Sequence, residues 1–195
     1  MNTFLALLLS YLLGCFCTAY YLVRWRTGQD IRTLGSGTAG AKNAGRILGA
    51  RGFILAFLGD FGKGLLALWL ANRMEVGAWG IAAAMLAVVL GHLYPFQLGG
   101  RGGKGVAAGF GAVVGVLPLL GAYLLVVAAL CYGITRSFTG SGLITIALAP
   151  IVAWLLGAEP AQLVGLTLLT LLLLLAHRTN LRAIFQDGWQ AAGGE

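Results

Sequence analysis

The sequence predicts an all-α integral membrane protein with seven transmembrane helices, its N-terminus outside and its C-terminus in the cytoplasm. Of the 195 residues, 59% are hydrophobic and only 10% are charged, whereas a soluble domain has about 25% charged residues. The apolar residues form long runs, and Lys and Arg lie mainly in the short segments between them. Because basic residues accumulate in the cytoplasmic loops of membrane proteins, this pattern also sets the orientation.

The first three apolar runs cover residues 3–23, 52–71 and 78–98. Each is long enough to cross about 30 Å of hydrocarbon. Arg24 and Arg26 follow the first run, whereas a signal peptide carries its positive charge before the apolar region. We therefore expect the first run to be a span, with the chain entering the cytoplasm at its end.

The second run is interrupted by two charges, Asp60 and Lys63. They are three residues apart, so they share a helix face and can pair. A charge at mid-membrane is also a common mark of a substrate path. The sequence favours pairing and leaves the path as the functional alternative.

The uncharged run at residues 105–135 decides the topology, because it is long for one helix and short for two. Pro118 lies near its middle, where a proline can break a helix. The last two apolar runs cover residues 137–158 and 160–176. Two short helices in the long run give seven spans and leave every Lys and Arg except Arg73 and Lys63 on the cytoplasmic side. We choose this model over six spans because the Lys and Arg bias sets orientation.

The segment GGRGGKG at residues 99–105 is an unusual polar loop between two apolar runs. Glycine lets backbone amides approach a ligand closely, and successive N–H groups beside a lysine form a cradle for anions. A nucleotide-binding P-loop needs Gly five residues before the Gly-Lys pair and Ser or Thr after it. Leu98 and Gly105 occupy those places. The loop therefore indicates phosphate binding without a nucleotide-hydrolysing fold.

Two further polar segments reach the same membrane face in the seven-span model. They are SGTAGAKNAGR at residues 36–46 and HRTN at residues 177–180, and the Gly-Lys loop is itself preceded by GHLYP at residues 91–95. Their basic residues favour an anion at the membrane surface. The net charge of +7 does not indicate nucleic acid, because the charges are distributed as orientation signals.

In order and spacing, these segments resemble the motifs of the bacterial acyl-phosphate:glycerol-3-phosphate acyltransferases, the PlsY family. The family patterns are S-G-N-x-G-A-T-N-x-x-R, G-H-x-x-P followed by K-G-G-K-G-V-A, and H-R-x-N. The resemblance implies a seven-helix fold, with residues 1–195 forming a single acyltransferase domain in the bacterial cytoplasmic (inner) membrane and the active site on the cytoplasmic face. It implies transfer of a fatty acyl group from acyl phosphate to the 1-hydroxyl of glycerol 3-phosphate, giving lysophosphatidic acid and phosphate. No metal or other cofactor is implied, and we expect a monomer.

The resemblance also implies roles for particular residues. Arg46 and Lys104 should bind phosphate groups, and His177 is the candidate base because imidazole exchanges protons near neutral pH; a phosphate oxygen of a substrate is the alternative proton acceptor. The expected catalytic residues are Ser36, Arg46, Lys104, His177 and Asn180. The expected substrate-binding residues are Gly37, Lys42, Asn43, His92, Gly102, Gly103, Gly105 and Ser141. From its position near a span end alone, His92 is a structural hydrogen bonder rather than a catalyst.

Four departures from the family patterns leave the acceptor open. Thr38, Lys42 and Arg101 replace the family's Asn, Thr and Lys, and TGSG at residues 139–142 replaces Ser-Leu-Ala-Ser. Lys42 adds a charge inside the first motif, so a paralogue with a different acceptor is one alternative. A small transporter for organic phosphates, motivated by the buried charges, and a non-catalytic lipid-binding subunit are the others.

Overall fold

The computed structural model describes residues 1–189, and within that range every regular element is a helix. The chain separates into two compact units, Met1–Val116 and Leu117–Glu195. The first unit contains α1 (Asn2–Cys15), α2 (Thr18–Thr27), the 3-10 turn η1 (Ile31–Thr33), α3 (Ala41–Arg73), α4 (Gly77–Leu93), the 3-10 turn η2 (Phe96–Leu98) and α5 (Val106–Val116). The second contains α6 (Pro118–Thr135), α7 (Phe138–Leu155), α8 (Pro160–Ala176) and α9 (Arg178–Asp187).

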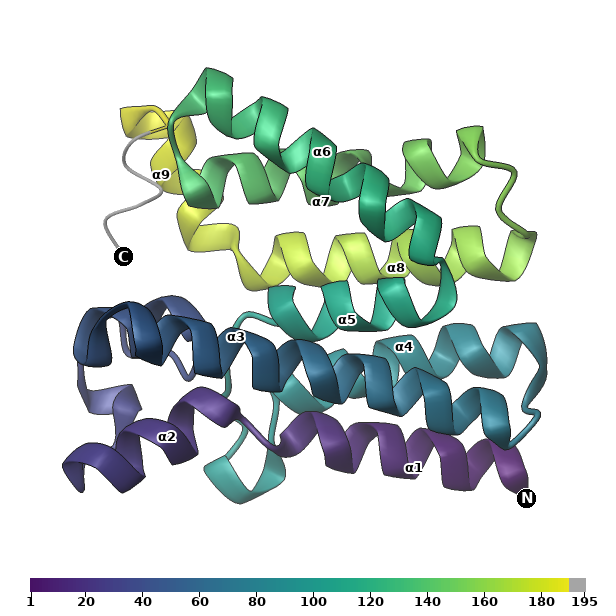
Figure 1. The fold of residues 1–195 in the computed structure, drawn as a ribbon, viewed down its shortest axis with the longest axis horizontal. Coiled ribbons are helices and arrows are strands. Elements are labelled where there is room, and N and C mark those ends of the chain that lie inside the picture. The colour runs from purple at the N-terminus through teal and green to yellow at the C-terminus, as the bar shows by residue number, and fades with distance from the viewer. Residues whose placement is uncertain (190–195) are drawn as a thin grey trace. The chain divides into compact units, whose positions relative to one another are not determined.

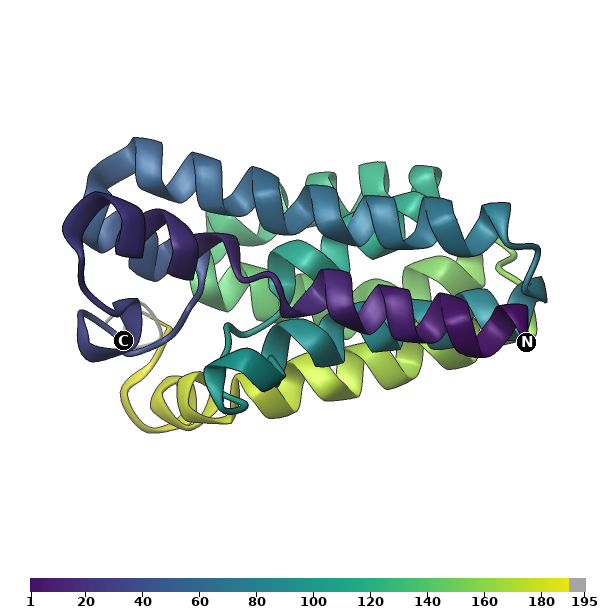
Figure 2. The same cartoon turned by 90° about the horizontal axis from the view of Figure 1, so that it is seen from below.

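In the first unit, α1, α3 and α4 lie side by side, and α5 packs against α3 (Figures 1 and 2). Glycines make the close crossings possible, because small residues let two helix backbones approach. A Cβ atom at Gly14 of α1 would overlap the carbonyl oxygen of Val88 in α4. A Cβ atom at Gly64 of α3 would overlap the carbonyl oxygen of Ala108 in α5. The glycines of the apolar runs therefore position the helices that carry the polar loops.

In the second unit, α6 packs on α7, and α7 packs on α8. Proline occupies the first helical position of both α6 and α8, where its missing N–H has no intrahelical partner to lose. Glu159 and Gln162 form a reciprocal capping box at the start of α8. The chain then turns by 66° between α8 and α9, and His177 lies at that turn.

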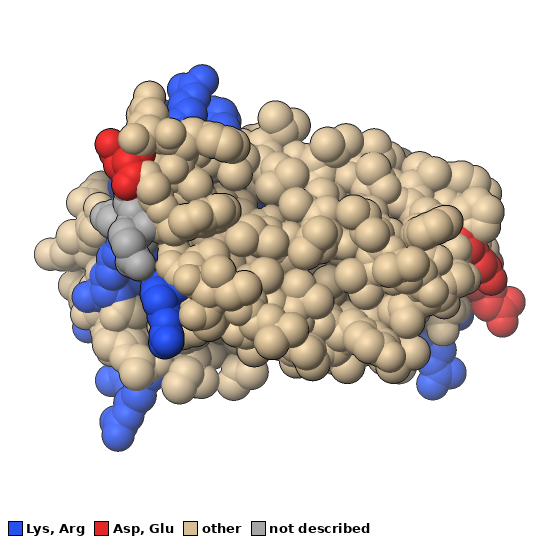
Figure 3. All heavy atoms as spheres, turned by 90° about the horizontal axis from the view of Figure 1, so that it is seen from above, with Lys and Arg blue, Asp and Glu red and all other residues tan. Residues whose placement is uncertain are grey.

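The helix lengths and composition fit a multi-pass membrane protein. Among the described residues, five stretches are long and apolar enough to cross a membrane, and six if α8 and α9 count as one bent span. In the view of Figure 3 the charged side chains lie toward the helix ends, and the middle of the surface carries none. α5 has only 11 residues, which at about 1.5 Å per residue is shorter than the hydrocarbon core.

Two breaks in the predicted spans have different origins. The break expected at Pro118 is confirmed, since α5 ends at Val116 and α6 begins at the proline. The first predicted span, residues 3–23, lies within one candidate span, Asn2–Thr27, but the chain leaves helical geometry inside it at Phe16 and Cys17. Neither proline nor glycine occupies the two broken positions, so contacts from elsewhere in the fold must hold that break.

Candidate active site

The first motif is a loop folded around the side chain of Asn43. The Asn43 amide nitrogen donates to the carbonyl oxygens of Ile31, Leu34 and Thr38 at 3.0–3.1 Å. Its amide oxygen accepts a hydrogen bond from the backbone N–H of Ser36 at 2.9 Å. Asn43 is only 1% exposed, and these contacts occupy both polar atoms of the amide. Its observed contacts therefore shape the loop, and the substrate-binding role that the resemblance implies for Asn43 stays a prediction.

A second clamp holds the loop from outside. The Arg32 guanidinium donates to both carboxylate oxygens of Asp30, at 2.6–3.1 Å, and also to the carbonyl oxygen of Leu98. The hydrogen bonds from Arg32 hold the pKa of the Asp30 carboxyl below its ordinary value of 3.8. Arg32 thereby links η1, which precedes the first motif, to Leu98, the residue before the Gly-Lys loop. The sequence analysis missed this clamp, and the only local signal was an acid and a base two residues apart.

The Gly-Lys loop is anchored through its backbone. The N–H of Gly102 donates to the carbonyl oxygen of Leu93, and the N–H of Gly103 donates to that of His92, both at 3.1 Å. The carbonyl oxygen of Gly102 in turn accepts a hydrogen bond of 3.2 Å from the N–H of Ala39 in the first motif. Two polar segments more than 50 residues apart in the chain are therefore joined in the first unit.

Each of these two motifs runs into the N-terminus of a helix. α3 begins at Ala41, within the first motif, and α5 begins at Val106, two residues after Lys104. Helix N-termini carry partial positive charge and exposed N–H donors, so they favour phosphate groups. Arg46 is exposed, and the side chains of Lys42 and Lys104 are partly buried. The joined motifs thus combine two helix N-termini with three cations.

Three predicted site residues belong to the second unit. His177 and Asn180 are both buried at the junction of α8 and α9. Nδ1 of His177 contacts the carbonyl oxygen of Leu173 at 2.8 Å. Because a carbonyl only accepts, Nδ1 carries the proton in this contact, which leaves Nε2 as the basic nitrogen of the neutral ring. The hydroxyl of Ser141 donates to backbone carbonyls of its own helix, those of Ser137 and Phe138.

The two charges within the second predicted span form an ion pair. Nζ of Lys63 lies 3.0 Å from Oδ1 of Asp60, and both side chains are buried. The pairing predicted from their spacing is confirmed. Nζ also lies 2.7 Å from Nδ1 of His92, in agreement with the structural role expected for that histidine. A transport path was suggested by this pair alone, so its engagement with other protein groups removes the observation that favoured transport.

The structure brings most of the predicted site residues together in the first unit. They lie in the two joined motifs or against them: Ser36, Gly37, Lys42, Asn43, Arg46, His92, Gly102, Gly103, Lys104 and Gly105. The remaining three, Ser141, His177 and Asn180, lie at helix ends of the second unit.

Comparison with known proteins shows the family of the chain. The family model described as glycerol-3-phosphate acyltransferase matches residues 4–187. The chain belongs to the glycerol-3-phosphate acyltransferase family. It is 41% identical to glycerol-3-phosphate acyltransferase 1 of Desulfitobacterium hafniense, over 93% of this chain and 90% of that one. It is also 41% identical to the Pseudomonas paraeruginosa glycerol-3-phosphate acyltransferase, over 91% and 93% of the two chains.

Solved structures show the same fold in this family. The crystal structure of PlsY (YgiH), an integral membrane glycerol 3-phosphate acyltransferase, in its glycerol 3-phosphate form superposes with a TM-score of 0.90 at 28% identity. That match covers 97% of this chain and 94% of the other. The lysophosphatidic acid form of PlsY superposes with a TM-score of 0.88 at 26% identity. The chain is thus an acyltransferase of the PlsY type with a multi-pass membrane fold.

Proposed function

We propose that this protein transfers a fatty acyl group from acyl phosphate to the 1-hydroxyl of glycerol 3-phosphate, which gives lysophosphatidic acid and phosphate. The observation that carries the proposal is the junction of the first motif and the Gly-Lys loop through Ala39 and Gly102. It combines two helix N-termini with Lys104, which lies between two glycines, a combination suited to phosphate. Family membership supports the acyl transfer and the acceptor.

The chemistry of the donor matches what these residues supply. Acyl phosphate is a mixed anhydride, so its carbonyl is already activated and phosphate is a good leaving group. Both substrates are anions, and the main task is to hold them together against their repulsion. Positioning of this kind lowers a barrier by about 7–11 kcal/mol in favourable cases. In the proposal, Arg46 and Lys104 bind the phosphate groups, and the N-terminus of α5 assists them. The N–H groups of Gly102 and Gly103, which were expected to help, already donate to the carbonyl oxygens of Leu93 and His92.

The acyl transfer itself balances with one proton transfer. The 1-hydroxyl oxygen of glycerol 3-phosphate attacks the acyl carbonyl carbon, the new ester C–O bond forms, and the C–O bond to phosphate breaks. The hydroxyl proton passes to Nε2 of His177 or to a phosphate oxygen. The tautomer at His177, with its proton at Nδ1 toward Leu173, supports the first route. Asn180, three residues after His177 in the chain, serves the same acceptor.

The proposal also covers the place of the reaction. We propose seven spans, with the N-terminus outside and the C-terminus in the cytoplasm. In this topology every Lys and Arg except Arg73 and Lys63 lies on the cytoplasmic side. α5 then contributes a short crossing, and residues 1–195 form a single acyltransferase domain. We further propose the bacterial inner membrane, an active site on its cytoplasmic face, and a monomer.

The test is product formation by the purified protein in lipid. Palmitoyl phosphate is supplied with and without glycerol 3-phosphate, and both phosphate release and lysophosphatidic acid are measured. We expect phosphate release to require the acceptor and to match the lysophosphatidic acid formed. Palmitoyl-CoA in place of palmitoyl phosphate should yield no product. Equal rates with palmitoyl-CoA would show that the proposed acyl-phosphate donor is wrong, although the glycerol 3-phosphate acceptor is right.

Site variants connect this activity to the proposed residues. Lys104→Ala and Arg46→Ala should abolish transfer while the thermal unfolding temperature in detergent stays near that of the parent. Arg73→Ala is the matched control, because Arg73 is an exposed cation at the other end of α3, beside the ring of Trp69. Full activity in a folded Lys104→Ala protein would exclude the proposed role of the Gly-Lys loop.

Because the first motif differs from the family pattern, the same assay is repeated with other acceptors. The hydroxyls of Ser36 and Thr38 lie 3.2 Å apart, so the threonine that replaces the family's asparagine contacts a proposed catalytic residue. Glycerol 1-phosphate, glycerol and dihydroxyacetone phosphate are supplied as alternative acceptors. Glycerol 3-phosphate should give the highest kcat/KM. A higher value for another alcohol would identify a paralogue with a changed acceptor.

A further inference from the structure

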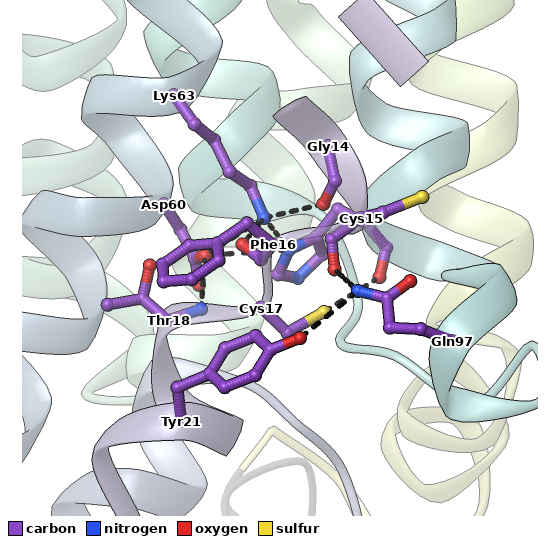
Figure 4. A network of polar contacts seen from close by, with 10 residues as sticks. Gly14, Cys15, Phe16, Cys17, Thr18, Tyr21, Asp60, Lys63 and Gln97 are labelled. Carbon is purple, nitrogen blue, oxygen red and sulfur yellow. Dashed lines mark hydrogen bonds and ion pairs between the residues drawn. The ribbon is translucent and has the colours of Figure 1, made fainter. Parts of the chain in front are cut away.

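Three polar side chains of the first unit are buried where the first span breaks. Asp60, Lys63 and His92 are 1%, 6% and 3% exposed, respectively. Charged side chains are almost never buried to this extent unless they are paired. Figure 4 shows Asp60 and Lys63 pointing from α3 toward the segment that joins α1 to α2. The proposed acyl transfer assigns no role to the charges of Asp60 and Lys63, so their burial calls for another explanation.

The ion pair of Lys63 and Asp60 provides hydrogen-bond partners for backbone groups on both sides of the break. Nζ of Lys63 donates to the carbonyl oxygens of Gly14 and Phe16, at 2.8 and 2.7 Å. Oδ1 of Asp60 accepts a hydrogen bond of 3.2 Å from the N–H of Thr18. A break at membrane depth needs such partners, because lipid offers none. The ammonium meets the negative end of α1 and the carboxylate meets the positive end of α2, so each charge is complementary to the helix dipole it faces.

The same ammonium sets the state of His92. Nζ of Lys63 lies 2.7 Å from Nδ1 of His92. Since an ammonium group only donates, Nδ1 accepts, and the ring is neutral with its proton on Nε2. The Lys63 nitrogen therefore fixes the orientation and the tautomer of the ring together.

The far edge of the His92 ring lies against the Gly-Lys loop. A Cβ atom at Gly103 would overlap Nε2 of His92. The carbonyl oxygen of His92 accepts a hydrogen bond of 3.1 Å from the N–H of Gly103. Sγ of Cys17 contacts the same oxygen at 3.7 Å. The ring and the backbone carbonyl of His92 thus hold Gly103 in place, and Gly103 is the residue directly before Lys104. Nε2 of Gln97 in η2 donates to the carbonyl oxygen of Cys15 at 2.6 Å. This contact connects the segment before the Gly-Lys loop to the break between α1 and α2.

We propose that Lys63 is a positioning residue for the acyl transfer: it orients His92, and His92 holds Gly103 and the loop that presents Lys104. Lys63 does not touch substrate in this proposal. Asp60 balances its charge and, with it, holds the break that leads the chain from α1 into the first motif. The inference rests on the proposed function, because the loop is taken to bind substrate phosphate.

The kinetic test uses a variant that leaves no buried charge unpaired. Removing Lys63 alone would strand Asp60, and such single changes are strongly destabilising. The double variant Lys63→Met with Asp60→Asn removes both charges while keeping similar side-chain volumes. We expect a folded protein whose kcat/KM for glycerol 3-phosphate is lower by about 10- to 100-fold, as for groups that orient a binding residue. The matched control is Gly80→Ala in α4, whose Cβ would crowd the side chain of Val76, the residue before that helix, and so lower stability without touching the network. Unchanged KM and kcat in the double variant would overturn the proposal, as would an equal kinetic loss in Gly80→Ala at the same loss of stability.

Two variants of His92 distinguish the contact of its ring with Lys63 from the contact with Gly103. His92→Asn keeps an acceptor near the Nδ1 position for Lys63 but lacks the edge at Gly103. His92→Gln carries an amide that reaches the Nε2 position. Positioning of the loop predicts that His92→Gln recovers part of the kcat/KM lost in His92→Asn. The reverse order would show that the ring matters only as a partner for Lys63.

A spectroscopic test does not depend on catalysis. The chain has two histidines, so nitrogen NMR of a histidine-labelled sample gives two ring systems, assigned by the His92→Asn variant. We expect His92 to carry its proton on Nε2 in the parent and to lose this fixed tautomer in the double variant. A proton on Nδ1 in the parent would overturn the proposal even if the kinetics agreed. If the parent forms no lysophosphatidic acid, the proposed function fails, and this measurement still decides whether Lys63 sets the state of His92.

Discussion

The side-chain oxygen of Asn43 accepts a hydrogen bond of 2.9 Å from the backbone N–H of Ser36, seven residues earlier in the chain. Asn43 belongs to the first turn of α3, whereas Ser36 belongs to the loop before it. The contact makes the helix start and the loop one structural unit. It also holds the backbone of the glycine-rich loop at Ser36 in a fixed place.

Replacing Asn43 by aspartate should disable the first motif. The carboxylate keeps an acceptor for Ser36, but its second oxygen would face the carbonyl oxygens of Ile31, Leu34 and Thr38 in place of a donor. Unpaired buried polar groups cost about 1–3 kcal/mol each. We expect stability to fall by about 3 kcal/mol and acyl transfer to be lost, as measured by unfolding in detergent and by lysophosphatidic acid formation. Asn72→Asp, at an exposed position of the same helix, should match the parent, and an equal loss there would contradict the explanation.

Two glycines of α3 should respond in opposite directions to alanine. A Cβ atom at Gly64 would overlap the carbonyl oxygen of Ala108 and lie 2.9 Å from the nitrogen of Ala112. A Cβ atom at Gly62 would meet nothing within 4 Å. Gly64→Ala should therefore lower stability by about 1–3 kcal/mol, the usual effect of overpacking. Gly62→Ala should raise it by up to about 1 kcal/mol, because alanine is the better helix former.

The comparison is made by thermal unfolding of both variants in one detergent. Gly64→Ala should also reduce acyl transfer, because α5 begins directly after the Gly-Lys loop. Similar unfolding temperatures for the two variants would mean that α3 and α5 do not pack as closely as described.

Thr18→Val should leave the protein as stable as the parent or more stable. Among the described residues, the Thr18 hydroxyl is the buried side-chain oxygen or nitrogen with no hydrogen-bond partner. Replacing it by a methyl group of similar shape removes a desolvation penalty of about 1–3 kcal/mol. Thr27→Val is the control, since the Thr27 hydroxyl donates to the carbonyl oxygen of Val23 and accepts from the N–H of Gln29. If Thr18→Val proves the more destabilising of the two in thermal unfolding, the hydroxyl has a partner.

The Asp30 clamp should contribute stability that disappears in acid. Arg32 stabilises the ionised carboxylate, so the pKa of Asp30 in the folded protein lies below its ordinary value of 3.8. A depressed pKa means that the contribution is complete above the unfolded pKa and is lost as the pH falls through the folded one. The unfolding temperatures of the parent and Asp30→Asn should differ by a constant amount at about pH 5 to 8 and converge below about pH 4. Both side chains are about a quarter exposed, so the difference should be small and should shrink in high salt. A difference that grows in acid would contradict the assignment.

Local sequence features predicted much of the fold correctly. Long uncharged runs require a membrane, since lipid accepts only helices whose backbone groups are paired internally. Pro118 breaks the run at residues 105–135 because it lacks a donor and collides with the preceding turn. Asp60 and Lys63 pair because a spacing of three places them on one helix face. The glycine and lysine pattern of residues 99–105 predicts a phosphate-binding loop from equally local features, and phosphate binding there stays a prediction.

The sequence by itself thus determined the membrane class, most of the helix breaks and the residues of the polar motifs, because these depend on neighbours within a few positions. Only the tertiary structure decided that the first span breaks at Phe16 and Cys17, since its loose ends are satisfied by Lys63 and Asp60, more than 40 residues away. Only it showed that Asn43 holds a loop and that His92 lies between the ion pair and Gly103. Each of these contacts joins separate helices or loops, and no periodicity in the sequence records which distant backbone groups a buried polar side chain will meet.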